Sequence, residues 1–285
     1  MMKRSLRRRS SSRKRSVVIK EMVGRLGNQM FEYASALGIA HRKKGTVCIA
    51  DKEWEEDSKE DLIKVCVGPF KRCNNIKGPI TLVPEDAYAK YNPSPFLVSG
   101  NVEIETDLDQ GFLQSWKYFQ PVKKEVLKKF KFKRAIASRA ERYIDKAKAG
   151  RTTVIGIHIR RGDHIGLGYM RFPPMSYFKK AQQYFRKKYK KVKFVIATND
   201  RAWARENFKS KDTEIITSSK SAPEDMAILT LCSGLIMSLG TFSWWAGYLG
   251  KGQVVYYNRE FVMSHAVNAG NVSKEDYYPP KWIGM

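Results

Sequence analysis

From residue 153 to the C-terminus, short apolar segments alternate with segments of helical periodicity, and this alternation limits the possible folds more than any other feature of the chain. Strands that are each followed by a helix form a parallel sheet, because a parallel neighbour requires a crossover connection. The second half is therefore predicted to be a Rossmann-like α/β domain. The predicted strands are 153–159, 193–198, 213–217, 235–239 and 253–257, and the predicted helices are 175–190, 201–209, 222–233 and 241–250.

The first half opens with a shorter unit of the same kind. Residues 17–23 are typical of a strand, Gly24 and Gly27 lie in the loop that follows, and apolar residues at helical spacing predict a helix from Gln29 to about Gly45. Residues 46–50 are predicted as the next strand. Glycine in the first turn lets a ligand approach the backbone, and the helix start offers free amides. Many such turns carry glycine for packing only, so this signal is weak by itself.

The remainder of the first half is less regular. Residues 51–110 contain five prolines and are predicted to be irregular, whereas the aromatic-rich stretch 111–119 is more typical of core than of a sugar-binding surface. Helices are expected to fill 121–149. We therefore predict an N-terminal α/β domain over 17–150 and a Rossmann-like domain over 151–285, preceded by a disordered basic tail over residues 1–16.

The chain is strongly basic, with a net charge of +25 from 53 Lys and Arg against 28 Asp and Glu. The tail, residues 1–16, holds eight of the basic residues and no acidic residue, and two further clusters occupy 123–134 and 186–193. Such charge attracts nucleic acid, an anionic membrane or a polyanionic substrate. We expect the two internal clusters to be solvated surface, and polyanions remain candidate partners of the tail.

The cysteines and histidines show no metal-ligand spacing, which predicts that the chain has no structural metal. Cys48 and Cys232 lie in apolar runs and are expected to be buried as small hydrophobic residues, as in a reducing compartment. No segment approaches the ~20 apolar residues that cross a bilayer, and no signal-peptide pattern opens the chain. The predicted location is therefore the cytoplasm.

Three predicted strands of the second half end in polar residues: the segments 158–163 (HIRRGD), 197–200 (ATND) and 238–245 (SLGTFSWW). A parallel sheet brings such ends to one edge, where open α/β sheets bind ligands. The planar guanidinium fork matches phosphate oxygens, although Arg160 and Arg161 could instead form salt bridges at a domain edge. Together the three ends predict a cleft for a nucleoside diphosphate.

Other residues of these loops suit the same ligand. The hydroxyls of Thr241 and Ser243, with the free amides of the predicted helix start, make an anion site. The Asp200 carboxylate could accept two hydrogen bonds from a purine edge. Phe242 could stack on a base, whereas the two tryptophans that follow it are expected in the core.

Five sequence blocks, in order, resemble the motif set of the α-1,2-fucosyltransferases of glycosyltransferase family 11. The most specific pair is HIRRGD with the downstream GTFSWW, and the resemblance runs from about Val17 to about Asn258. His164 departs from the pattern, since the family often has an aromatic residue there. The five blocks are GRLGNQMFEYA (24–34), GFLQSWKYF (111–119), HIRRGD (158–163), ATND (197–200) and SLGTFSWWAGYL (238–249).

The resemblance implies a variant of the two-domain glycosyltransferase B architecture. It also implies inverting transfer of L-fucose from GDP-fucose to an oligosaccharide acceptor, at O-2 of a galactoside. GDP-fucose would be the donor substrate, and no metal or other cofactor would be needed. The C-terminal half would hold the donor and the N-terminal half would contribute the acceptor side. The basic tail stands where Golgi members have a membrane anchor, which implies a soluble cytoplasmic enzyme of bacterial or viral type.

The resemblance assigns roles to individual residues. Arg160 would hold the diphosphate and stabilise the leaving GDP. Asp163 would be the candidate catalytic base, or would hold Arg161. His158 and Asp200 would contact the guanosine. The other expected donor-binding residues are Gly24, Gly27, Asn28 and Gln29 from the first half and Arg161, Asn199, Ser238, Thr241, Phe242 and Ser243 from the second.

Two alternatives stay open at this point. The chain could make a different fucosyl linkage or use another GDP-sugar, because the acceptor site depends on the divergent segment 51–110. A basic nucleic-acid-binding protein would account for the charge, but the sequence lacks recognised nucleic-acid-binding motifs such as a zinc-finger pattern.

Overall fold

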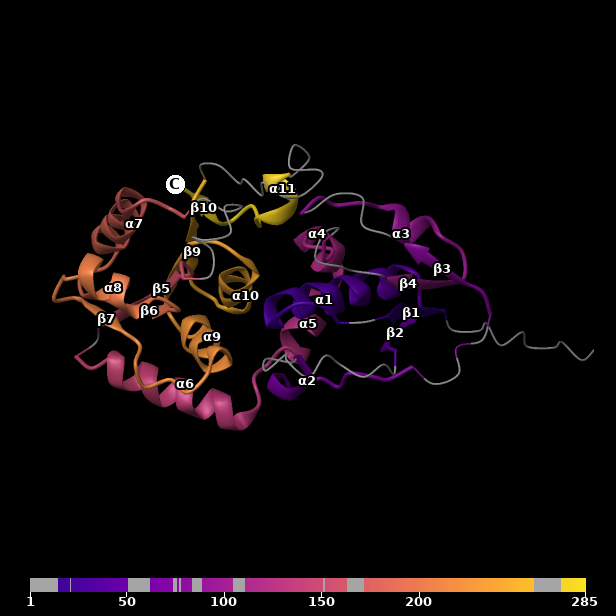
Figure 1. Ribbon diagram of the computed structural model, residues 1–285, viewed down its shortest axis with the longest axis horizontal. Coiled ribbons are helices and arrows are strands. Elements are labelled where there is room, and N and C mark those ends of the chain that lie inside the picture. Colours follow the sequence, from indigo (N-terminus) through magenta and orange to yellow (C-terminus); the bar gives the residue numbers. More distant parts are fainter. Residues whose placement is uncertain are drawn as a thin grey trace, which may run out of the picture.

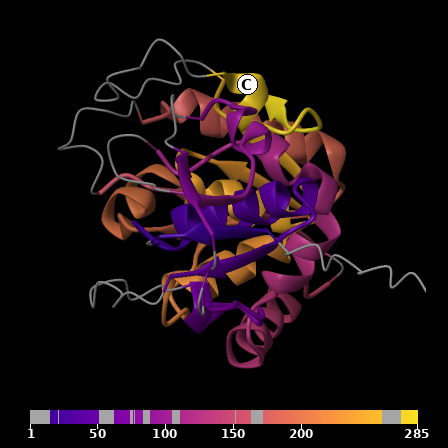
Figure 2. The ribbon, with the colours of Figure 1, turned by 90° about the vertical axis from the view of Figure 1, so that its right-hand side faces the viewer.

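The computed structural model of the chain contains two parallel β-sheets, which lie side by side with helices between and around them (Figure 1). Seen from the side of the first sheet, the second sheet and its helices lie behind (Figure 2). The structure describes residues 15–20, 22–50, 62–73, 76, 78–83, 89–104, 111–150, 152–162, 172–258 and 273–285.

The first sheet has the strand order β2-β1-β4-β3, and all of its pairs are parallel. Its strands are β1 (Ser16–Ile19), β2 (Thr46–Ile49), β3 (Ile80–Val83) and β4 (Asn101–Ile104). The helical elements described between β1 and the second sheet are α1 (Leu26–Arg42), α2 (Leu62–Val65), α3 (Ser94–Leu97), α4 (Trp116–Phe119), η1 (Gln120–Val122), α5 (Lys123–Lys129) and α6 (Arg134–Ala147).

The second sheet has the order β10-β9-β8-β5-β6-β7 and is also parallel in every pair. Its strands are β5 (Thr153–Ile159), β6 (Val192–Thr198), β7 (Thr213–Ile215), β8 (Gly234–Met237), β9 (Gln253–Tyr256) and β10 (Ile283–Gly284). The helices described in this half are α7 (Met175–Lys188), α8 (Arg201–Asn207), α9 (Ala222–Thr230), α10 (Thr241–Leu249) and α11 (Lys274–Tyr277).

Both faces of the second sheet are covered, as parallel sheets require. Along β5, Ile155 and Ile157 pack into a cluster with α7, whereas Val154 packs into a larger cluster on the opposite face. That larger cluster also contains the apolar side chains of α1, β1 and β4. One continuous core therefore joins the two sheets.

An aromatic group forms the centre of this shared core. The Phe31 ring of α1 lies 4.5 Å from the Trp244 ring and 5.1 Å from the Trp245 ring of α10, measured between centroids. Phe119 stacks on Trp245 at 5.5 Å. All four side chains are fully buried, so the prediction that the two tryptophans belong to the core is confirmed. The aromatic residues of the stretch 111–119 belong largely to the same core, as expected.

The predicted elements of the second half agree with the structure, within three residues at each end. The short helix α11 and the short strand β10 were not predicted. In the first half, the strand predicted over 17–23 ends at Ile19, and the helices predicted over 121–149 are separate elements. The prediction that 51–110 is irregular is wrong at β3 and β4, since β4 lies in the interior of the first sheet. Its four residues, NVEI, are too few to show a period, and their pairing partners are distant in sequence.

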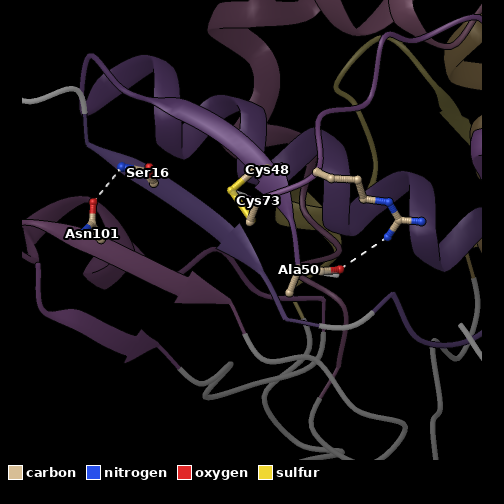
Figure 3. Close-up of a disulfide and its surroundings, with 6 residues drawn as sticks. Ser16, Cys48, Ala50, Cys73 and Asn101 are labelled. Carbon is tan, nitrogen blue, oxygen red and sulfur yellow. Dashed lines mark hydrogen bonds between the residues drawn. A yellow bond between two sulfur atoms is a disulfide. The ribbon is translucent and has the colours of Figure 1, made fainter. Parts of the chain in front are cut away.

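The structure corrects the prediction for Cys48. This cysteine forms a disulfide with Cys73, which joins the end of β2 to the segment that follows α2 (Figure 3). The neighbouring backbone is paired as well, because Ile49 forms a parallel bridge with Arg72. Cys232 is a buried free thiol, as predicted. A disulfide persists in oxidising surroundings, so the cysteines no longer support a reducing compartment, and the cytoplasmic location stays a prediction.

Candidate active site

The carboxyl end of β5 places His158 and Arg160 at the edge of the second sheet. His158 is 7% exposed, and its ring stacks on Phe242 with 4.9 Å between centroids. The backbone amide of Arg160 donates to the buried Ser238 hydroxyl at 3.1 Å. Ser238, which follows β8, therefore fixes the backbone from which the Arg160 side chain extends.

Arg161 points to a different set of partners. Its guanidinium donates to Asp200 Oδ2 at 2.6 Å and lies 5.0 Å from the Trp203 ring centroid. Its backbone amide donates to Asn199 Oδ1 at 2.9 Å. The salt-bridge alternative thus holds for Arg161, which connects the loops after β5 and β6. The Asp163 partner considered for it lies outside the described residues.

Asp200 serves as the N-cap of α8. Its Oδ1 accepts from the Trp203 amide at 3.1 Å, and its Oδ2 accepts from Arg161. These two hydrogen bonds lower the pKa of Asp200, and the one from the Trp203 amide has the larger effect. Both oxygens of Asp200 therefore hold the loops after β5 and β6 together, and its contact with a purine edge stays a prediction.

A pocket of about 210 Å³ lies at this edge, between the two sheets. Six of the predicted ligand residues line it, and so do Arg25, Ala197, Thr198, Ala222 and Asp225, which were not predicted. Asp225 lies in the first turn of α9, where Ser221 is the N-cap. Acidic residues are common in the first turn because their charge interacts favourably with the positive end of the helix dipole. The sequence therefore offers no reason to assign this carboxylate to a ligand. The six predicted residues are Gly27, His158, Arg160, Asn199, Thr241 and Phe242.

Two helices begin at the pocket. Ala222 and Thr241 are the first residues of α9 and α10, and both line it. Gly240 precedes α10 with a φ of 88°, a left-handed conformation that glycine adopts without strain. Backbone amides at helix starts carry a partial positive charge. With the guanidinium of Arg160 they make this part of the pocket suitable for an anion.

The first half reaches the same pocket through the start of α1. Gly27 approaches α10 so closely that a Cβ there would lie 2.5 Å from Thr241 Oγ1 and 2.9 Å from the Phe242 amide nitrogen. The Asn28 side-chain oxygen accepts from Thr241 Oγ1 at 2.9 Å and from Gln114 Nε2 at 3.3 Å. Asn28 is therefore a link between the two halves beside the pocket.

Several predicted ligand residues do not line the pocket and have structural partners instead. Gln29 is fully buried, donates to the Gly24 carbonyl and accepts from the Leu62 amide. Ser243 is fully buried and donates to carbonyl oxygens of the preceding turn. Gly24 forms the turn before α1 with a φ of 73°. The predicted residues outside the pocket lining are Gly24, Asn28, Gln29, Arg161, Asp200, Ser238 and Ser243, while Asp163 is not described.

No group of three His, Cys, Asp or Glu side chains is arranged to hold a metal ion in the described ranges. Among the described helices, none combines the length and the apolar character that a membrane crossing requires.

Two parallel sheets with a pocket between them, at the carboxyl ends of strands of the second sheet, are the arrangement of a two-domain glycosyltransferase B fold. The family model for glycosyl transferase family 11 matches residues 102–285. The chain belongs to that family and is a glycosyltransferase similar to the galactoside α-1,2-fucosyltransferases.

Individual relatives agree with this family. Galactoside alpha-(1,2)-fucosyltransferase 1 of Oryctolagus cuniculus is 29% identical over 281 residues, covering 92% of this chain and 71% of the relative. Galactoside alpha-(1,2)-fucosyltransferase 2 of Sus scrofa is 24% identical over 278 residues, covering 92% and 78%.

Solved structures show the same fold at low identity. NodZ alpha-1,6-fucosyltransferase soaked with GDP-fucose has a TM-score of 0.55 and 14% identity, covering 86% of this chain and 96% of that one. POFUT1 in complex with GDP-fucose has a TM-score of 0.53 and 13% identity, covering 85% and 98%. At this identity the likeness concerns the fold, which confirms the predicted architecture.

Proposed function

We propose that the enzyme transfers L-fucose from GDP-fucose to a hydroxyl of an oligosaccharide, O-2 of a galactoside, with inversion at the anomeric carbon. The observation that carries the proposal is the position of Arg160 in a pocket where the starts of α9 and α10 converge. A guanidinium together with helix-start amides suits a diphosphate. The names of the relatives and of the NodZ and POFUT1 complexes support fucose and GDP-fucose as the group transferred and its donor.

The chemistry follows from charge development on the leaving group. When the bond between the anomeric carbon and the β-phosphate oxygen breaks, negative charge accumulates on GDP. Arg160 and the helix-start amides stabilise that charge, and they do so more strongly in the transition state than in the bound donor. The acceptor oxygen attacks from the opposite face, so that a β-linked donor gives an α-linked product. Asp163 stays the candidate base and would take the hydroxyl proton.

We assign the nucleoside end of the donor to the residues around Asp225. This carboxylate lines the pocket, whereas Asp200 does not. A carboxylate can accept two hydrogen bonds from the paired N–H donors of a guanine edge. The stacked pair of His158 and Phe242 provides an adjacent flat wall. Asn199 and Thr198 complete the site from the end of β6.

We propose residues 151–285 as the donor side and residues 17–150 as the acceptor side. Arg25 and Gly27 support this division, because they bring the first half to the rim of the donor pocket. The proposal keeps transfer independent of metal, with Arg160 and the helix starts in place of a cation. The competing function is transfer to a different acceptor hydroxyl or from a different GDP-sugar. That choice depends on the acceptor site, to which the segment 51–110 contributes.

Donor binding is tested by thermal unfolding with GDP, GDP-fucose, GDP-mannose and UDP-galactose, without added metal. A ligand that binds only the native state raises the free energy of unfolding by about 2.7 kcal/mol at a hundredfold excess over its Kd. We expect stabilisation by GDP and GDP-fucose and a smaller effect from the UDP-sugar. A folded protein that responds to no guanine nucleotide contradicts the proposal.

Transfer is tested with a β-galactoside and its 2-deoxy analogue as acceptors. We expect product from the galactoside and not from its 2-deoxy analogue. In the NMR spectrum of the product, the coupling constant of the fucose anomeric proton should be that of an α-linkage. Arg160→Ala is expected to lower kcat by at least about a hundredfold, as loss of one preorganised charge-stabilising group does. Arg201→Ala is the control, since Arg201 is exposed at the start of α8 and is not among the pocket residues. Unchanged activity in the Arg160 variant removes its assigned role.

A further inference from the structure

A second and larger cavity lies at the opposite edge of the second sheet. It is a groove of about 1240 Å³, bordered by Thr230, Leu231 and Ser233 before β8 and by residues 249–252 before β9. The donor pocket lies instead at the carboxyl ends of β5 and β6. Because the strands are parallel, the two cavities open on different edges of the sheet. The volume exceeds that of a usual small-molecule site, so the groove suits an extended ligand.

The two internal basic clusters of the sequence meet at this groove. Lys123 and Lys131 come from the cluster 123–134, and Lys188 comes from the cluster 186–193. Lys251 and Lys281 join them from the segments before β9 and β10. All five lysines are exposed. Among the described lining residues Glu141 is the one acidic side chain, and no arginine is present.

Aromatic side chains form much of the groove wall. Trp116, Tyr189 and Trp282 are half-buried there, and Tyr248, which also lines the groove, is buried. The ammonium group of Lys123 lies 4.8 Å from the Tyr248 ring centroid. Aromatic rings offer flat apolar faces to sugar rings, and the surrounding ammonium groups offer charge to substituents on those rings. The lining thus combines stacking surfaces with positive charges spaced along the groove.

We propose that this groove binds an anionic glycan, a chain of sugar rings that carries sulfate or carboxylate groups. The five lysines come from four separate segments of the chain, so their charges match anionic groups spread along a ligand. Concentrated, bidentate phosphate recognition favours arginine, which the lining lacks, and this makes nucleic acid the weaker candidate. The inference goes beyond the donor site and does not depend on the transfer reaction.

Calorimetric titration tests the proposal directly. The probes are a heparin-derived hexasaccharide, neutral maltohexaose and a single-stranded DNA oligonucleotide, all at the same ionic strength because charge contacts are screened by salt. The groove variant combines Lys123→Gln, Lys131→Gln and Lys188→Gln. The control combines Lys64→Gln, Lys209→Gln and Lys211→Gln, which are exposed lysines outside the groove and remove the same net charge.

We expect the wild type and the control to bind the sulfated hexasaccharide equally, and the groove variant to bind it at least about tenfold more weakly, a change of roughly 1.4 kcal/mol. Trp116→Leu, which keeps every lysine, is expected to weaken the same binding. Equal losses in the two lysine variants, no binding by the wild type, or tighter groove-dependent binding of DNA would each overturn the proposal. GDP stabilisation of the groove variant is expected to be unchanged, so this outcome is separate from the donor assignment.

Discussion

The hydroxyl of Thr241 donates a hydrogen bond to the side-chain oxygen of Asn28 at 2.9 Å, although 213 positions separate the two residues in the chain. Thr241 begins α10 in the second half, and Asn28 lies in the first turn of α1 in the first half. Their contact lies beside the donor pocket, which Thr241 and Gly27 both line. The two halves of the enzyme are therefore fixed to each other at the site itself.

Gly27→Ala is expected to separate α1 from α10. An added Cβ would lie within 3 Å of backbone atoms of both Thr241 and Phe242, which cannot rotate away. Overpacking of this kind lowers the free energy of unfolding by about 1–3 kcal/mol. This loss outweighs the higher helix propensity of alanine relative to glycine. Urea unfolding measures the change. Gly162→Ala is the control, because its Cβ would make only an ordinary contact with Asn199; equal stabilities would contradict the close packing.

Thr241→Val keeps the shape of the side chain and removes its hydroxyl. We expect a loss of about 1 kcal/mol in the free energy of unfolding. We also expect the Kd for GDP to rise several-fold, because the hydrogen bond to Asn28 orients the start of α10. Thr230→Val removes a hydroxyl that bonds only within α9, to Ala227. The comparison separates the two effects: both variants lose stability, and only the Thr241 variant loses GDP affinity.

The Cys48–Cys73 disulfide closes a segment with a sequence separation of 25. Cross-linking a loop of that size stabilises a protein by roughly 3 kcal/mol in the chain-entropy model, so Cys73→Ala is expected to lower the Tm. Burial raises the pKa of the free thiols Cys66 and Cys232 to about 12, and both should react slowly before unfolding. Alkylation of the denatured, unreduced protein is expected to label two cysteines. Labelling of four would rule out the disulfide.

Arg139 of α6 donates to Glu224 of α9 at 2.7 Å, and the Glu224 side chain is only 5% exposed. Removing the arginine leaves a buried carboxylate without its cation. In fully buried pairs this lowers the free energy of unfolding by about 3–5 kcal/mol. The loss is smaller here, because the Arg139 side chain is 33% exposed. We expect Arg139→Ala to lower the free energy of unfolding by about 2 kcal/mol. Arg142→Ala, an exposed position on the same helix, should change it little.

Asp276 of α11 is predicted to make stability depend on pH. Burial raises the pKa of this carboxyl, but the Lys117 side chain and the Tyr91 amide outweigh burial, and the net pKa is lowered. Because the pKa of Asp276 is lower in the folded state than in the unfolded state, its carboxylate stabilises the fold fully above the ordinary Asp pKa of about 3.9. This stabilisation disappears as the pH falls through the folded-state pKa. Urea unfolding of the wild type and Asp276→Asn should differ at pH 7 and converge at low pH. A difference that does not change with pH would contradict this ion pair.

The sequence alone determined the features that depend on neighbouring residues. The alternation of apolar strands and helices after residue 153 specified a parallel sheet, and the polar residues after β5, β6 and β8 located its ligand edge. His158, Arg160 and Phe242 were found this way, because a strand end fixes the position of the residues that follow it. The roles of the ligand residues still rest on the proposal.

Tertiary structure decided whatever depends on residues far apart in the chain. It paired Cys48 with Cys73, placed the short strand β4 inside the first sheet, and brought Asp225 to the pocket while Asp200 became a helix cap with an arginine partner. It also brought Lys123 and Lys188 to one groove. Local sequence cannot supply these results, because a carboxylate, thiol or ammonium group acquires its role from the partner that long-range packing places beside it.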